Sequence, residues 1–199
     1  MSIRRGCGVA PPRPMSLLSW NIRTVRALQK VINKEDPAIV FLMETKSDLD
    51  WMMKLKDWCK FKNSFVVPCQ RKSRGLAMLW KEEVKLDIQT YSSSHTDAWV
   101  KGGDTVGWWH LTSFYGEPDT SKRPELWQKL KHLSRTSNLP WLIIGDFNEI
   151  TCVDEKEGGS CRPQQQLGNF VDTINWCRLK DLRFIGSKFM WLYQRGDGL

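Results

Sequence analysis

The chain has 199 residues, 41% of them hydrophobic, which is enough to bury the core of one globular domain. Its formal net charge of +8 favours a polyanionic partner such as nucleic acid. No apolar run approaches the roughly 18 residues of a membrane span, and the six cysteines show neither a CxxC pair nor the Cys/His spacing of a zinc site. These features argue against a membrane protein and against a zinc domain.

The first fourteen residues differ in composition from the rest of the chain. Residues 1–14 are rich in Arg and Pro and lack the apolar stretch of a signal peptide. This composition predicts a disordered N-terminal extension. Residues 15–199 carry no internal repeat, low-complexity tract or linker, so they predict a single domain.

Apolar runs then alternate with amphipathic segments, as is typical of a mixed α/β domain. Continuous or alternating apolar residues predict strands at 16–21, 38–43, 65–67, 76–80, 85–90, 98–100, 106–115, 141–144 and 189–193. Apolar residues at helical spacing predict helices at 24–34, 47–58, 120–134 and 164–177.

The most informative polar residues directly follow the apolar run at 141–144. Gly145 ends that run, and Asp146 and Asn148 come next with one residue between them. At the end of a strand this spacing directs both side chains the same way. A carboxylate beside a neutral amide suits metal-assisted phosphate chemistry, because one group orients water and the other donates to a phosphate oxygen. A simple Asx turn is the structural alternative.

Three further polar residues end predicted strands: Asn21, Glu44 and Tyr115. Strand ends meet at one edge of an α/β sheet, where ligands bind, and carboxylate and amide oxygens suit Mg²⁺. Each residue alone has a bland alternative. Asn21 would merely end a strand, Glu44 would pair with a nearby lysine, and Tyr115 would belong to the core.

The order of four motifs overrides these alternatives. Ser19–Asn21, Leu42–Lys46, Phe114–Gly116 and Gly145–Glu149 resemble, in order and spacing, the endonuclease/exonuclease/phosphatase superfamily. The version resembles the apurinic-type endonuclease domain of plant LINE-type non-LTR retrotransposons. The resemblance covers about residues 15–197. It implies an α/β, DNase I-like fold, a four-layer sandwich of two packed mixed β-sheets flanked by helices, with the last strands missing.

The resemblance also implies roles for individual residues. Glu44 matches the metal-ligating glutamate, and Asn21 matches the asparagine that supports metal and phosphate. Tyr115 matches the tyrosine that contacts the scissile phosphate. Asp146 matches the aspartate that orients the attacking water, and Asn148 matches the amide that stabilises developing charge. The implied cofactor is Mg²⁺, with Mn²⁺ as an alternative, and the implied partner is DNA, bound by a nuclear monomer.

Several departures from the family pattern predict weak activity. The family ends its site with an Asp and a His that lie beyond the strand at 189–193, and this Asp–His pair does not appear before Leu199. The loop after Asn21 is short, and Arg74, Arg178 and Arg183 stand where the family favours Gly. The sequence therefore predicts an impaired or inactive endonuclease-like domain. A phosphatase of the same superfamily, a non-catalytic nucleic-acid-binding remnant and a translated pseudogene fragment remain as alternatives.

Overall fold

The computed structural model describes most of the chain in seven segments. These are residues 2–5, 15–22, 25–45, 49–69, 75–102, 107–156 and 162–182, with the backbone alone described for 2–5 and 25. The expected strand at 189–193, the start of the expected helix at 47–58, and the residues Arg74 and Arg183 lie outside these segments.

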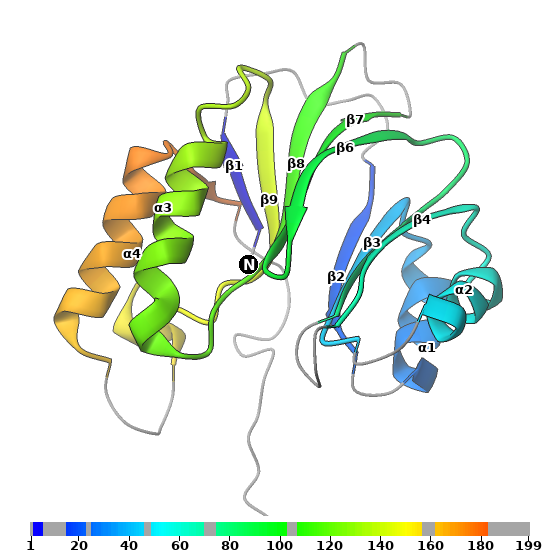
Figure 1. The fold of residues 1–199 in the computed structure, drawn as a ribbon, viewed down its shortest axis with the longest axis horizontal. Helices are drawn as coiled ribbons and strands as arrows, with labels where there is room; N and C mark the ends of the chain where they lie inside the picture. Colours follow the sequence, from blue (N-terminus) through cyan, green and yellow to red (C-terminus); the bar gives the residue numbers. More distant parts are fainter. Residues whose placement is uncertain are drawn as a thin grey trace, which may run out of the picture.

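Two mixed β-sheets form the centre of the molecule (Figure 1). The four-stranded sheet has the order β2 (Leu17–Asn21), β3 (Ile39–Met43), β5 (Leu76–Trp80) and β4 (Asn63–Val67). The six-stranded sheet has the order β10 (Lys180–Asp181), β1 (Ser2–Arg5), β9 (Trp141–Asp146), β8 (Trp109–Tyr115), β7 (His95–Lys101) and β6 (Lys85–Ser92). The pairs β2–β3 and β8–β9 are parallel, and the other pairs are antiparallel.

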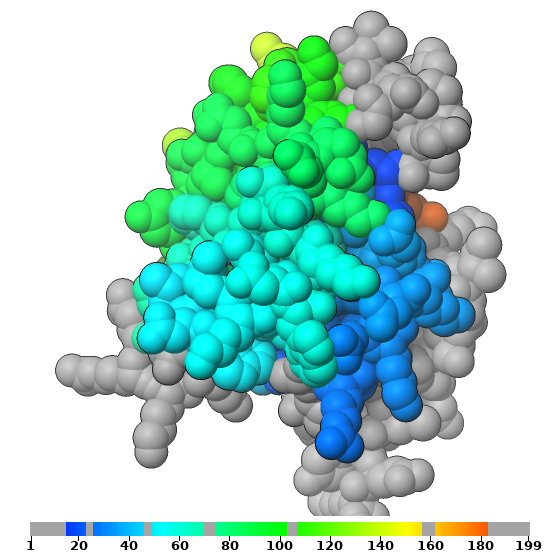
Figure 2. Space-filling view, turned by 90° about the vertical axis from the view of Figure 1, so that its right-hand side faces the viewer, coloured from blue at the N-terminus to red at the C-terminus, as the bar shows by residue number. Residues whose placement is uncertain are grey.

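Helices cover the outer face of each sheet, which gives four layers. The helices α1 (Val25–Glu35) and α2 (Leu49–Trp58) cover the four-stranded sheet, and Figure 2 shows the blue and cyan face that they build. The helices α3 (Arg123–Leu133) and α4 (Gln164–Trp176) lie side by side on the six-stranded sheet. Two short 3₁₀ turns, η1 (Thr120–Lys122) and η2 (Val153–Glu155), complete the described elements. The α/β class and the two-sheet sandwich expected from the sequence are confirmed.

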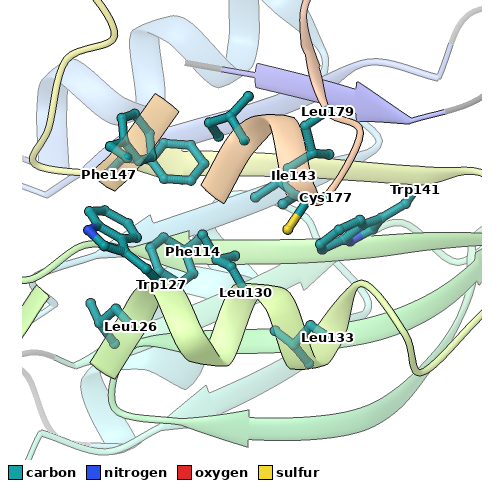
Figure 3. Packing of buried hydrophobic residues seen from close by; sticks show 12 residues of the cluster. Phe114, Leu126, Trp127, Leu130, Leu133, Trp141, Ile143, Phe147, Cys177 and Leu179 are labelled. Atoms are coloured by element: carbon teal, nitrogen blue, oxygen red, sulfur yellow. The ribbon is translucent and has the colours of Figure 1, made fainter. Parts of the chain in front are cut away.

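Three buried clusters hold the layers together. Between the sheets, Phe41 and Met43 pack with Leu111, Tyr115 and Ile144. A second cluster joins α1 and α2 to the four-stranded sheet, and a third joins α3 and α4 to the six-stranded sheet (Figure 3). Because both faces of β3 are covered, all five of its residues are buried, which is why its sequence is a continuous apolar run.

The structure corrects the expectation that residues 1–14 are disordered. Ser2–Arg5 forms β1, which pairs antiparallel with β9 on one side and with β10 on the other. The backbone groups of β9 on that side would otherwise lack partners, and ladder pairing satisfies them. Residues 6–14 lie outside the described segments.

Element boundaries differ from the expected ones by a few residues. The helix expected at 120–134 divides into η1 and α3, because Pro124 lies in the first turn of α3, where proline is favoured. The strand expected at 98–100 begins earlier, at His95. None of the helices in the described segments is long and apolar enough to cross a membrane.

Candidate active site

The parallel strands β8 and β9 end side by side and form the base of the candidate site. Tyr115 stands opposite Asp146 in the register of the two strands. The backbone N–H of Gly116 donates to the Asp146 carbonyl oxygen at 2.6 Å, which extends the ladder by one step. The two sequence-predicted residues therefore leave the sheet at the same edge.

Two glycines allow this close approach. A Cβ on Gly145 would lie 1.8 Å from the carbonyl oxygen of Phe114, and the φ of Gly145 is +141°. A Cβ on Gly116 would lie 1.9 Å from the carbonyl oxygen of Phe147. No side chain fits at either position without moving backbone, so the geometry of the strand ends requires glycine at both.

Asp146 and Asn148 are joined by a tight turn. The Asp146 carboxylate oxygen Oδ1 accepts a hydrogen bond from the backbone N–H of Asn148 at 2.8 Å. Asn148 has a φ of 53°, and its Nδ2 donates to the Gly116 carbonyl oxygen at 2.8 Å. The Asx turn considered as the structural alternative is present, and it fixes both side chains.

Glu44 and Tyr115 bring the two sheets together at this edge. The Tyr115 hydroxyl donates to Oε1 of Glu44 at 2.5 Å, across a sequence separation of 71 residues. Glu44 follows β3 with a φ of 54°, which is uncommon for a residue other than glycine. No ion pair to Lys54 is found among the described residues, and Lys46 lies outside them.

The protonation of Tyr115 follows from its surroundings. Burial raises the pKa of Tyr115 well above its usual value, and the hydrogen bond to Glu44 and the charges of Glu44 and Asp146 raise it further. A hydrogen bond from the Asn148 side chain acts in the opposite direction. Tyr115 is therefore a neutral hydrogen-bond donor at physiological pH, and four of the five expected residues interact with one another.

Asn21 lies at the end of the neighbouring strand β2. Its partner in the parallel register is Met43, and the backbone N–H of Ile22 donates to the Met43 carbonyl oxygen at 3.0 Å. Asn21 thus stands one strand away from the residue that precedes Glu44. Its side-chain oxygen Oδ1 is buried and has no hydrogen-bond partner among the described residues. A buried amide oxygen without a partner is a candidate ligand for a cation.

A buried ion pair joins the loops that follow β8 and β9 beside the site, and the sequence alone does not predict the pair. The Arg123 side chain donates to Oε2 of Glu149 at 2.5 Å and to the Glu117 carbonyl oxygen at 2.8 Å. Arg162 approaches the other carboxylate oxygen of Glu149 at 3.4 Å. Glu149 belongs to the motif that contains Asp146, so a sequence signal exists for Glu149. Arg123 looks like any charged residue at the start of a helix.

The contacts of the three histidines are with other residues, although His95 stands opposite Phe114, the residue before Tyr115, in the register of β7 and β8. His95 interacts with Ser92 and Thr90, and Nε2 of His110 lies 2.7 Å from Oδ1 of Asp97 in the buried part of the six-stranded sheet. His132 is exposed in the last turn of α3. That none of the three histidines takes part in the site stays a prediction.

Several solved structures share the fold. The chain is similar to the endonuclease domain of TRAS1, a telomere-specific non-LTR retrotransposon, with 15% identity, a TM-score of 0.58, and coverage of 80% of this chain and 71% of that one. It is also similar to an AP endonuclease from Archaeoglobus fulgidus, with 11% identity, a TM-score of 0.61, and coverage of 81% and 70%. A 3′ phosphatase from Neisseria bound to a product DNA hairpin matches with 14% identity, a TM-score of 0.60, and coverage of 82% and 71%.

No curated protein matches the chain by sequence. The model of the Endonuclease/Exonuclease/phosphatase family matches residues 18–182, which include all five candidate residues and every described strand except β1 and the first residue of β2. The motifs at the ends of β2, β3, β8 and β9, the two-sheet fold and this match agree, and the chain belongs to the Endonuclease/Exonuclease/phosphatase family.

Proposed function

We propose that this chain is a divalent-metal-dependent phosphodiesterase domain that acts on DNA. One observation carries the proposal: Glu44 from one sheet and Tyr115, Asp146 and Asn148 from the other form one interacting group at a single edge. Two carboxylates and two neutral donors within one group match the needs of phosphoryl transfer, in which negative charge must be oriented and stabilised.

The residues present fit a hard divalent cation. Glu44 supplies a carboxylate, and Asn21 supplies a buried amide oxygen that has no hydrogen-bond partner among the described residues. No group of three or more His, Cys, Asp and Glu side chains gathers closely enough to hold a metal in the described part of the chain. Mg²⁺ tolerates such a small protein donor set, because it keeps several waters and takes further oxygen ligands from the substrate phosphate. When bound, the ion would neutralise charge on the phosphate.

The side chains divide the remaining work. The Asp146 carboxylate orients a water molecule and accepts its proton as the water attacks phosphorus, while the P–O bond to the leaving oxygen breaks and that oxygen takes a proton from solvent. The Asn148 amide has a second N–H that can donate to a phosphate oxygen, and the neutral Tyr115 hydroxyl can do so when its single O–H turns from Glu44 to the phosphate. The Asx turn fixes the positions of Asp146 and Asn148 relative to each other. The water bound by Asp146 is therefore held next to the phosphate bound by Asn148.

The substrate and the origin of the chain are part of the same proposal. The net charge of +8 favours a polyanion, and the four motifs resemble those of plant LINE-type retrotransposon endonucleases. We assign the chain a DNA substrate, a retroelement ancestry and, in keeping with that substrate, action as a monomer in the nucleus. In this proposal the part of the chain that resembles the family begins near residue 15, and β1 adds a strand from residues 1–14 to its six-stranded sheet.

Turnover by this 199-residue chain is expected to be slow. Many metal-assisted phosphoryl transfers use a histidine near the phosphate, whereas His95 is hydrogen-bonded to Ser92, His110 to Asp97, and His132 is in the last turn of α3. Without an equivalent group the developing charge loses one source of stabilisation, and loss of a comparable catalytic unit costs about 10³-fold or more in kcat.

Nicking of supercoiled plasmid DNA in the presence of Mg²⁺ tests the proposal directly. The variants Asp146→Asn and Glu44→Gln should each reduce nicking by about 10²-fold or more, since each removes a carboxylate of the site. Asp154→Asn is the matched control, because Asp154 is an exposed carboxylate in η2. Equal nicking by the parent and Asp146→Asn would refute the catalytic assignment.

Binding of Mn²⁺, followed by its electron paramagnetic resonance signal, provides a readout that does not need turnover. The parent should bind Mn²⁺ more tightly than Glu44→Gln or Asn21→Leu. Metal binding without nicking would identify a non-catalytic remnant. Release of phosphate from a 3′-phosphorylated oligonucleotide without plasmid nicking would instead identify a phosphatase.

A further inference from the structure

An exposed tryptophan beside two cations marks the far end of α3 and α4. Trp176, the last residue of α4, is 56% exposed. Nζ of Lys131 lies 5.7 Å from the centre of its ring, and Cζ of Arg135 lies 5.2 Å from it. The cations therefore lie beside an aromatic ring that remains accessible to a ligand.

The same residues line a hollow of about 330 Å³, together with Gln128 and His132. No acidic residue is among the described residues that line it. Lys131 and Arg135 form no ion pair within the described segments. The hollow thus presents positive charge that no carboxylate of its own walls neutralises.

A second hollow is lined by the loop that follows Arg135 in the chain. The loop Thr136–Leu139 lines this hollow of about 580 Å³ together with Trp99, Trp108 and one acidic residue, Asp87. These two tryptophans are 37% and 40% exposed. Three accessible indole rings are therefore distributed on either side of a basic residue at this end of the molecule.

We propose that this surface, defined by Lys131, Arg135 and Trp176 and continued by Trp99 and Trp108, binds single-stranded DNA. Unpaired bases stack on exposed aromatic rings, whereas the bases of a duplex are already stacked on one another. The two cations lie where they can contact the phosphates of the same strand.

A simpler explanation accounts for only part of the surface. Cations are favoured in the last turn of a helix by the helix dipole, and this explains Lys131 and His132. It does not explain Arg135, which lies beyond the end of α3, or the exposure of Trp176. Charge complementarity together with the accessible rings favours a strand of nucleic acid as the occupant.

The surface is separate from the candidate active site. The helix α3 begins at Arg123, which contacts the loops beside the site, and ends at Leu133. Its eleven residues span about 16 Å. Binding at one end can therefore be measured independently of the other, although the choice of DNA over RNA rests on the proposed function.

Fluorescence anisotropy with a labelled oligothymidylate of about 12 nucleotides, in EDTA, tests the surface without cleavage. The test variant combines Lys131→Gln, Arg135→Gln and Trp176→Ala. The matched control combines Arg26→Gln, Lys30→Gln and Trp58→Ala on α1 and α2, on the opposite side of the molecule (Figure 2). Both variants lose two positive charges and one exposed tryptophan, since Trp58 is 49% exposed.

The test variant should bind about tenfold or more weakly than the control, since it lacks one stacking platform and two phosphate contacts. Its plot of log K against log salt concentration should be less steep by about 1.4, which corresponds to two single-strand phosphate contacts at about 0.7 each. The assay in EDTA needs no cleavage, so failure of the catalytic proposal leaves this result intact, and Asp154→Asn, at an exposed carboxylate of η2, should bind as the parent does. Equal affinities of the two triple variants, or binding of oligouridylate but not oligothymidylate, would overturn the proposal.

Discussion

Gly145 sets the distance between the two strands that carry Tyr115 and Asp146. A Cβ at this position would lie 1.8 Å from a backbone oxygen, and the φ of +141° is itself unfavourable for other residues. We expect Gly145→Ala to lower the free energy of unfolding by about 3 kcal/mol, since backbone must move and strain remains.

Gly168→Ala is the matched control for this substitution. Gly168 lies within α4, and a Cβ there would have no neighbour within 4 Å. Alanine at an open helical position should raise the free energy of unfolding by about 0.5–1 kcal/mol. Urea denaturation of both variants checks the pair. If the two substitutions changed the free energy of unfolding by similar amounts, Gly145 would not lie as close to Phe114 as described.

His95 should make the folded state sensitive to mild acid. Burial and, to a smaller extent, the charge of Lys129 lower the pKa of His95 from 6.5 to about 4, and the charge of Asp97 opposes this change. Between these two values the unfolded chain binds a proton that the folded chain does not, so stability rises with pH in this range. The contribution is complete above pH 6.5 and declines as the pH falls towards 4. At about 1.36 kcal/mol per pKa unit, it reaches about 3 kcal/mol at most.

The variant His95→Gln tests this dependence, because it keeps a polar side chain but cannot titrate. Unfolding by urea at a series of pH values should show a flatter profile for His95→Gln than for the parent between pH 4 and 6.5. His132→Gln, at an exposed position of α3, should follow the parent profile. A parent profile that is already flat would exclude a neutral buried His95.

Residue patterns predicted some local conformations and missed others. Arg178 stands at a helix end where glycine is favoured, and its φ is 52°, as that reasoning requires. Asp146 and Asn148 lie together as expected, but an Asx turn holds them and not strand spacing, because β9 ends at Asp146. Arg123 could not be foreseen, because its partner Glu149 is 26 residues away and meets it only through the packing of α3 against the strand ends.

At the scale of elements, β1 is the main difference from the sequence expectation. We expect deletion of residues 1–14 to lower the free energy of unfolding by about 2 kcal/mol or more, because β1 pairs with both β9 and β10 and each net hydrogen bond contributes about 1 kcal/mol. Thermal and urea unfolding of the shortened chain measure the effect.

A single substitution separates the loss of pairing from the loss of chain length. Ile3→Pro removes a backbone donor within β1 and should reproduce much of the deletion's effect. If neither change alters stability, residues 1–14 are a disordered extension, as their composition suggests.

The reason why some elements were predictable is physical. The strand β3 and the helix α4 have hydrophobic patterns that reflect their burial, and both were expected close to their observed bounds. Ser2–Arg5 is short and carries two arginines, so its pattern favours no strand. Its conformation depends on pairing with β9, more than 130 residues away, and the local sequence does not predict such pairing.

At the scale of the whole molecule, the family resemblance supplied what periodicity could not. Hydrophobic patterns predict strands and helices, but they do not assign strands to two sheets or place β8 beside β9 in parallel. The ordered motifs carried that information. They also brought Glu44 and Tyr115 into one expected site, although the residues belong to different sheets. Asn21 was expected there as well, and the structure places it one strand away from Met43, the neighbour of Glu44.

The hydrogen bond between Tyr115 and Glu44 makes the layer between the sheets a spacer of fixed thickness. Glu44 rests on one sheet and Asp146 on the other, so the gap between their carboxylates is set by how Met43, Tyr115 and Ile144 interlock. Protein interiors are close-packed, and a gain or loss of one methylene is felt by neighbouring residues. Substitutions in this apolar layer would therefore change the distance between the Glu44 and Asp146 carboxylates, even if every polar residue of the site stayed the same.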